Sequence, residues 1–190
     1  IDMILNHFAT GTLHINTNPK VEIIYQDARS GLSLDKLKYP LITQQPLYLR
    51  QAGSSNLLSE EYLKMVSERM TDDGVLLVYA NSLGCEAQKL VIHKTLKKVF
   101  PYCVSFLDRY AYVVSKSPIT FNRESIEKKL SVENDDLVNE IKSAMTVDDI
   151  LSMKDTADFT DWQNCQYTVT DDCPILEYPE ILTEISKNWK

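Results

Sequence analysis

The chain has little glycine and lacks the motifs that depend on it. Its five glycines are scattered over 190 residues, so the sequence holds neither a phosphate-binding P-loop nor a dinucleotide-binding fingerprint. No apolar run approaches the roughly 18 residues that cross a bilayer, and no basic segment followed by an apolar stretch marks a signal peptide. These absences favour a soluble globular chain, and we expect it in the cytoplasm.

Paired cysteines and metal-ligand spacings are also missing. The four cysteines are widely separated and form no CxxC pair, which favours free thiols in a reducing compartment. The three histidines have no metal spacing with cysteines or carboxylates, so we expect ordinary surface or partly buried histidines and no metal site. A formal net charge of −7 argues against nucleic acid or an anionic membrane as the main partner.

Strand-like segments recur along the first 118 residues. They are β-branched and aromatic stretches or continuous apolar runs, and they lie at 21–26, 39–43, 74–80, 102–107 and 110–115. The run GVLLVYA at 74–80 follows a predicted turn at 71–74 and is typical of a parallel strand covered on both faces. The last two segments predict a hairpin around Asp108 and Arg109.

Two amphipathic helices are predicted between these strands. Ser59 is a predicted N-cap, with Glu60 and Glu61 in the favourable first turn of the helix that follows. The second helix covers about 86–100 and stops at Pro101. Strand, helix, strand, helix and hairpin in this order predict an α/β sheet, mostly parallel with an antiparallel edge.

The remainder of the chain is acidic and helical. Asn122 is a predicted cap for a helix to residue 130, another helix covers 137–144, and Thr146 with Asp149 resembles a capping box for a third. We therefore predict two domains. A sheet domain spans 1–118, and a small helical extension spans 119–190 and ends in the segment TDDCPILEYP.

Six blocks of the sequence resemble, in order, those of the polyamine aminopropyltransferase (spermidine synthase) family. The blocks are IDMILNHF, NPKVEIIYQDARSGL, YPLITQQP, GSSNLLSEEYLKMVSERMTDDGVLLVY, FPYCVSF and TDDCPILEYP. The chain is most similar to the branch often fused to membrane segments, and the resemblance covers nearly all of it. It implies the C-terminal part of a Rossmann-like fold of the class I S-adenosylmethionine-dependent methyltransferase type.

The resemblance implies an adenosyl nucleoside site and S-adenosylmethionine or its decarboxylated form as cofactor. In open α/β sheets ligands lie at the carboxyl ends of strands, and the family's acid there accepts a hydrogen bond from the adenine amino group. This role falls on Asp27, with the backbone of Ala28 beside it. A helix cap near Arg29 is the alternative role for Asp27, and the two are compatible. Asp2 belongs to the block whose ribose-binding glutamate would precede Ile1.

The family's chemistry also requires a base. A primary amine is mostly protonated at neutral pH, with a pKa near that of lysine, roughly 10. The resemblance puts the family's acid at Gln45, which cannot take a proton, and the polyamine-binding loop is missing between Phe106 and Tyr112. We expect Gln45 and Tyr79 beside the reacting centre and Tyr48 at the substrate, although packing is an open alternative for both tyrosines.

Two functions from different classes stay open. One is an aminopropyltransferase-like or methyltransferase-like enzyme, with a nucleoside and an amine acceptor as small-molecule partners. The other is a non-catalytic binding or interaction module. In TDDCPILEYP we expect Ile175, Leu176 and Tyr178 to dock on the sheet, the alternative being that Asp171 or Asp172 reaches the active-site rim.

The family's first two strands have no counterpart in the sequence. We therefore expect these residues to be the C-terminal part of a longer protein whose upstream segment is a partner. Without those strands, the segment 39–43 would expose an apolar parallel edge. A second copy, a swapped strand or a rearranged strand 21–26 should cover it, so a homodimer is among the expected states.

Overall fold

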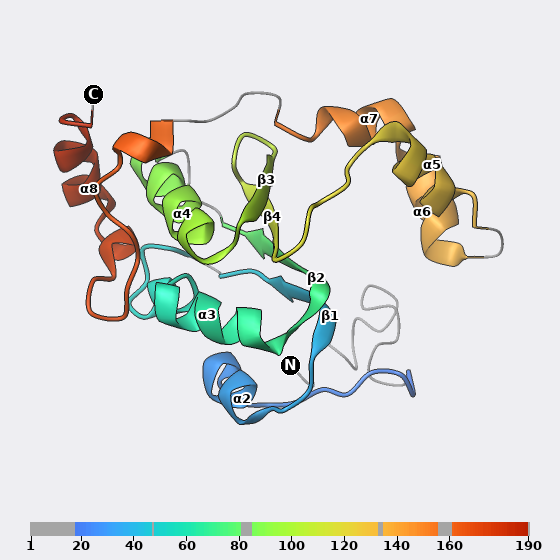
Figure 1. Cartoon of the computed structure of the whole chain (residues 1–190), viewed down its shortest axis with the longest axis horizontal. Helices are drawn as coiled ribbons and strands as arrows, with labels where there is room; N and C mark the ends of the chain where they lie inside the picture. Colours follow the sequence, from blue (N-terminus) through green and yellow to red (C-terminus); the bar gives the residue numbers. More distant parts are fainter. Residues whose placement is uncertain (1–17, 47, 81–84, 133–134, 156–160, 190) are drawn as a thin grey trace, which may run out of the picture. The chain divides into compact units, whose positions relative to one another are not determined.

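The computed structural model describes residues 18–46, 48–80, 85–132, 135–155 and 161–189 (Figure 1). The chain divides into two compact units, 1–34 and 35–190. The first unit contains helix α2 (Ala28–Leu34). The second contains the sheet and the remaining described helices. None of the helices described is long and apolar enough to span a bilayer.

A four-stranded mixed sheet forms the centre of the second unit. Its spatial order is β1 (Tyr39–Gln44), β2 (Met70–Tyr79), β4 (Ala111–Ser115) and β3 (Tyr102–Phe106). β1 and β2 are parallel, and β4 is antiparallel to both of its neighbours. The predicted α/β class, with its antiparallel edge hairpin, is confirmed.

The strand predicted at 21–26 is not found. These residues adopt no regular secondary structure, and Ile24 and Tyr25 are exposed. β-branched residues form a strand only where a neighbouring strand completes the backbone hydrogen bonds. Composition alone therefore predicted an element that the described chain does not form.

β2 begins before its predicted start. Its pairing with β1 passes from Tyr39↔Met70 to Leu41↔Val75, so residues 71–74 bulge out of the ladder. The predicted turn at 71–74 is therefore a bulge inside a strand. Glycine suits the end of this bulge, because a Cβ on Gly74 would lie 3.0 Å from the Tyr39 carbonyl oxygen.

The two faces of β2 differ in burial. Leu76 and Val78 are fully buried, whereas Leu77 and Tyr79, which alternate with them, are 37% and 36% exposed. The prediction of a strand covered on both faces is therefore wrong for the described chain. An unbroken apolar run shows that a strand is hydrophobic but does not show how many layers cover it.

Helices α3 (Glu60–Arg69) and α4 (Glu86–Val99) lie side by side in Figure 1 and contact each other. The predicted N-cap is confirmed, since the Ser59 hydroxyl accepts a hydrogen bond from the Tyr62 amide at 3.3 Å. α4 ends before Pro101, as its sequence predicted. Both helices bury apolar side chains, among them Leu63 and Leu96.

Three short helices follow the sheet, α5 (Arg123–Leu130), α6 (Asp136–Ala144) and α7 (Val147–Ser152). The capping box of Thr146 and Asp149 is confirmed. The predicted domain boundary near Pro118 stays a prediction.

The C-terminal segment docks on α4. It comprises the 3-10 turns η3 (Asp161–Asn164) and η4 (Ile175–Glu177) and helix α8 (Pro179–Ser186), which contacts α4. Leu176 is fully buried and Ile175 partly buried, whereas Tyr178 is exposed. The expected docking of TDDCPILEYP is thus found for Leu176, against a helix, and not for Tyr178.

Candidate functional site

The carboxyl ends of β1 and β2 lie side by side at one edge of the sheet, called here the carboxyl edge. The last registered pair is Gln44↔Val78, so Gln45 and Tyr79, each one position further along, are neighbours there. Both side chains are exposed. Tyr48, a few residues beyond β1, is exposed as well. Ligands of open α/β sheets bind outside such ends.

The turn between β3 and β4 lies at the same edge, because the Ala80 amide donates to the Tyr110 carbonyl at 2.9 Å. Three consecutive residues of this turn, 107–109, have φ values of 56°, 54° and 63°. This left-handed region is unfavourable for residues that carry a Cβ, and strained backbone of this kind persists only where surrounding contacts hold it.

Asp155 supplies such contacts. Its carboxylate accepts hydrogen bonds from the successive amides of Asp108 and Arg109 at 2.7 and 3.0 Å. Successive N–H groups that point to one spot form an anion-binding nest. In this chain the nest is filled by a carboxylate from the segment after α7.

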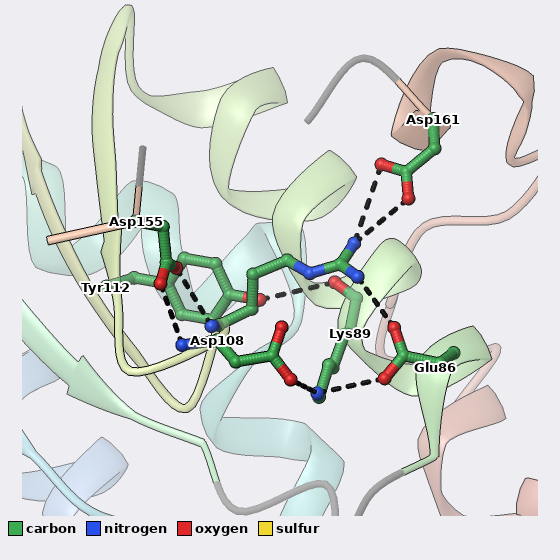
Figure 2. Close-up of polar contacts among 7 residues, drawn as sticks. Glu86, Lys89, Asp108, Tyr112, Asp155 and Asp161 are labelled. Carbon is green, nitrogen blue, oxygen red and sulfur yellow. Dashed lines mark hydrogen bonds and ion pairs between the residues drawn. The ribbon is translucent and has the colours of Figure 1, made fainter. Parts of the chain in front are cut away.

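Two cations with almost no solvent access meet here, one from helix α4 and one from the turn itself. The side chains of Lys89 and Arg109 are 2% and 5% exposed. The Lys89 ammonium contacts Glu86 at 2.9 Å and Asp108 at 2.5 Å, and the Arg109 guanidinium contacts Glu86 at 2.6 Å and Asp161 at 3.2 Å. Figure 2 shows Glu86 and Asp108 on two sides of the Lys89 ammonium. We call these five residues the cation cluster.

Protonation in the cation cluster follows from these contacts. Burial disfavours the Lys89 ammonium, but hydrogen bonds to Asp108 and Glu86 outweigh it and raise the pKa of Lys89 above its ordinary value. The hydrogen bond from Lys89 lowers the pKa of Asp108. A carboxylate with a lowered pKa is a weak proton acceptor. The cluster therefore holds its charges and is poorly suited to remove a proton.

Helix α4 also carries a buried histidine. His93 stacks on Trp162, with ring centroids 5.8 Å apart, and meets Tyr112 edge-on at 5.7 Å. Burial, followed by the charges of Arg109 and Lys97, lowers the pKa of His93 to about 4. This side chain is neutral at physiological pH. The expectation of a surface or partly buried histidine is wrong at this position.

Asp27 and Ala28 belong to the first unit, at the start of α2. One carboxylate oxygen of Asp27 accepts a hydrogen bond from the Ser30 amide at 2.8 Å, and this bond lowers the pKa of Asp27. The capping role that the sequence left open is thus present. A carboxylate has about four acceptor positions, so capping does not exclude a ligand. Asp2 lies outside the described residues.

A cavity of about 600 Å³ opens where α4 begins. α8 forms its other wall, and its charged lining residues are Arg50, Glu86 and Glu180. No group of three or more histidine, cysteine, aspartate or glutamate side chains within the described ranges is arranged to hold a metal ion.

Sequence reasoning missed the cation cluster and Asp155. Asp155 is 46 residues from Arg109, and Asp161 is 52 residues from it, so no local spacing indicates these contacts. Only Glu86 and Lys89, three positions apart on one helix face, had a spacing from which an ion pair is predictable.

No known protein family and no curated protein matches the sequence. Solved structures with a similar chain path include MnmC2 from Aquifex aeolicus, which is 18% identical with a TM-score of 0.38 and is matched over 70% of this chain and 45% of its own. Human methyltransferase-like protein 13 in complex with SAH is 14% identical with a TM-score of 0.45, over 82% of this chain and 70% of its own. The chain thus spans less than half the length of the first.

Proposed function

We propose that the chain is a transferase-like domain that binds an adenosyl nucleoside at the carboxyl edge. The ligand is S-adenosylmethionine, its decarboxylated form or methylthioadenosine. The main support is the parallel β1–β2 pair, whose adjacent carboxyl ends present Gln45 and Tyr79 to solvent. Separately from this edge, the resemblance to the spermidine synthase family supports the class of ligand, because the sequence at Asp27 and Ala28, in the first unit, matches the family's adenine-binding block.

The side chains at this edge suit binding better than proton removal. The exposed ring of Tyr79 offers a face to a base or a sulfonium cation. The Gln45 amide can donate and accept hydrogen bonds but cannot take a proton. The carboxylates of Glu86 and Asp108 are held by Lys89. A bound sulfonium nucleoside therefore meets hydrogen-bonding and aromatic groups, and an amine acceptor meets no free base among them.

Calorimetric titration of the natural full-length protein with the three nucleosides tests the proposal. The family resemblance implies a hydrogen bond from the adenine amino group to the Asp27 carboxylate, so we expect Asp27→Ala to weaken methylthioadenosine binding by about tenfold or more. Asp27→Ser keeps a helix-capping oxygen and should weaken binding to a similar extent. Asp149→Ala removes a capping carboxylate of α7 and should leave affinity unchanged.

The serine variant separates the two roles of Asp27. If Asp27→Ser binds as tightly as the parent while Asp27→Ala does not, the carboxylate acts on the helix and not on adenine. If the parent binds none of the three nucleosides, the proposed function is wrong.

The full-length protein is not expected to make spermidine from putrescine and decarboxylated S-adenosylmethionine at a useful rate. Gln45 stands where the family has its acid, and the polyamine loop is missing, so both the base and the subsite are lost. Gln45→Asp should restore little without the loop. Chromatography of the products checks this, and robust spermidine formation by the unmodified protein would show that another residue serves as base.

A non-catalytic binding module is the second candidate function. It is favoured by Gln45 at the base position and by the engaged state of the nearby carboxylates. Nucleoside binding without transfer to any amine or methyl acceptor would support it. Transfer chemistry with any acceptor would reject it.

A further inference from the structure

The loop that follows the carboxyl edge is held from the far end of the chain. This loop, residues 48–58, connects the edge to α3 and carries Tyr48. It includes the 3-10 turn η2 (Ser54–Leu57), and Gly53 before it has a φ of +86°, which glycine adopts without strain. Its own backbone hydrogen bonds form turns, and the side chains of Leu49 and Leu58 are buried.

Glu177 binds this loop through three hydrogen bonds. One of its carboxylate oxygens, Oε1, accepts from the Gly53 amide at 2.8 Å, from the Ser55 hydroxyl at 2.7 Å and from the Ser55 amide at 3.4 Å. The residues are up to 124 positions apart in sequence. Ser55 is fully buried, so the carboxylate satisfies polar groups that water does not reach.

Glu177 is itself fixed to the body of the second unit. The preceding residue, Leu176, is fully buried, and its carbonyl accepts a hydrogen bond at 2.6 Å from the buried Gln88 amide on α4. The Glu177 backbone is therefore tied to a helix and not to another loop. A carboxylate on such an anchor can hold its partners in one place.

We call the three hydrogen bonds of Glu177 the tether. Two successive turns connect this tether to Tyr48. The Ser54 amide donates to Gln51, and the Gln51 amide donates to the Tyr48 carbonyl, both at 3.0 Å. At the other end of the loop, the Gln44 side-chain amide donates to the Leu57 carbonyl at 2.9 Å. The loop is thus held both at the end of β1 and at Glu177.

We infer that Glu177 is a positioning residue of the nucleoside site, acting through Gly53 and Ser55 to hold the 48–58 loop at the carboxyl edge. The inference rests on the proposed function. Loss of the tether leaves the loop in its binding arrangement for a smaller fraction of the time. The apparent dissociation constant rises by the inverse of that fraction, so a tenfold fall in occupancy weakens binding about tenfold.

Three variants and one control test this inference. Glu177→Ala removes all three hydrogen bonds, whereas Glu177→Gln keeps an acceptor oxygen and should recover most of the affinity. Ser55→Ala removes one partner, so adding Glu177→Ala to it should weaken binding by a smaller factor than in the parent. Glu184→Ala removes an exposed glutamate from α8 and serves as the control.

Two measurements are made on each variant of the full-length protein. Calorimetry with methylthioadenosine should show about a tenfold weaker affinity for Glu177→Ala and no change for Glu184→Ala. Amide hydrogen exchange without ligand should show faster exchange at Gly53 and Ser55 in Glu177→Ala, with the amides of β2 still protected. Faster exchange in β2 as well would indicate general unfolding of Glu177→Ala. The test of the positioning role then rests on Glu177→Gln, which should recover most of the affinity.

The outcomes separate this inference from the proposed function. If the parent binds and Glu177→Ala binds equally well despite faster loop exchange, the positioning role is wrong and the proposed function stands. If the parent binds no nucleoside, the proposed function fails, and exchange at Gly53 and Ser55 still tests the tether. Unchanged exchange in Glu177→Ala would overturn the tether itself.

Discussion

Replacing Leu176 by alanine should lower the free energy of unfolding by about 2–5 kcal/mol, the range found when a buried leucine leaves a cavity. The Leu176 side chain has 0% exposure and anchors η4. The matched control is Ile181→Ala on the adjoining helix α8, where the side chain is 55% exposed. We expect that control to change stability by less than about 0.5 kcal/mol.

Urea titration measures both values, provided that the slope of the transition with denaturant stays constant. The two variants remove similar volumes from neighbouring elements, so a difference between them reports burial. Equal and small effects would show that the C-terminal segment does not dock on the rest of the chain. This result would also remove the anchor on which the positioning role of Glu177 depends.

Acidification from pH 6.5 to pH 4 should cost the protein about 3 kcal/mol of stability through His93 alone. Folding lowers the pKa of His93 from 6.5 to about 4, with burial as the largest cause. The unfolded chain therefore takes up a proton over this interval while the folded chain does not. Each pH unit of that interval favours unfolding by about 1.36 kcal/mol. The stabilisation is complete above pH 6.5.

His93→Phe is the test of this pH dependence. A phenylalanine keeps the aromatic contacts with Trp162 and Tyr112 but has no titrating group. Its stability should stay nearly flat between pH 6.5 and pH 4.5, where the parent loses most of the roughly 3 kcal/mol that depends on His93. A parent whose stability is constant over this range would contradict the assignment of a buried neutral histidine.

Carboxylates act in a separate pH window. Hydrogen bonds or ion pairs lower the pKa of several of them, so the stability that they contribute is present above their unfolded pKa values of about 4 and is lost as the pH falls further. These are Asp27, Asp35, Glu60, Asp108 and Asp149. Unfolding that remains in His93→Phe below pH 4 is therefore expected from this group.

Helix starts were predictable from the sequence because they are decided within one turn. Ser59 and the Thr146 box cap the next residues along the chain, so their partners are visible in the sequence. Whether residues 21–26 form a strand was not predictable in this way, since a strand needs a neighbour that its own residues do not specify. The prediction of a turn at 71–74 was wrong for the same reason, because the pairing of β2 with β1 makes these residues a bulge.

The candidate site likewise contains residues that the sequence predicted and residues that it did not. Gln45 and Tyr79 were expected near each other, and the parallel register brings their strand ends together. Asp161 lies 52 residues from its partner Arg109, and Gly53 lies 124 residues from its partner Glu177. Such contacts depend on how elements pack after the fold has formed, and no periodicity or motif of this sequence indicates them.

The position of β4 sets an order of assembly during synthesis of the chain. β4 lies between β2 and β3, although it is the last of the four strands along the sequence. A growing chain can form the β1–α3–β2 unit, but the inner edge of β2 stays open until residues 111–115 leave the ribosome. The β3–β4 hairpin then closes the sheet. The loop after β1 is fixed later still, since Glu177, which binds it, follows all four strands along the sequence. A nascent chain therefore completes the described four-stranded sheet before it fixes the loop after β1.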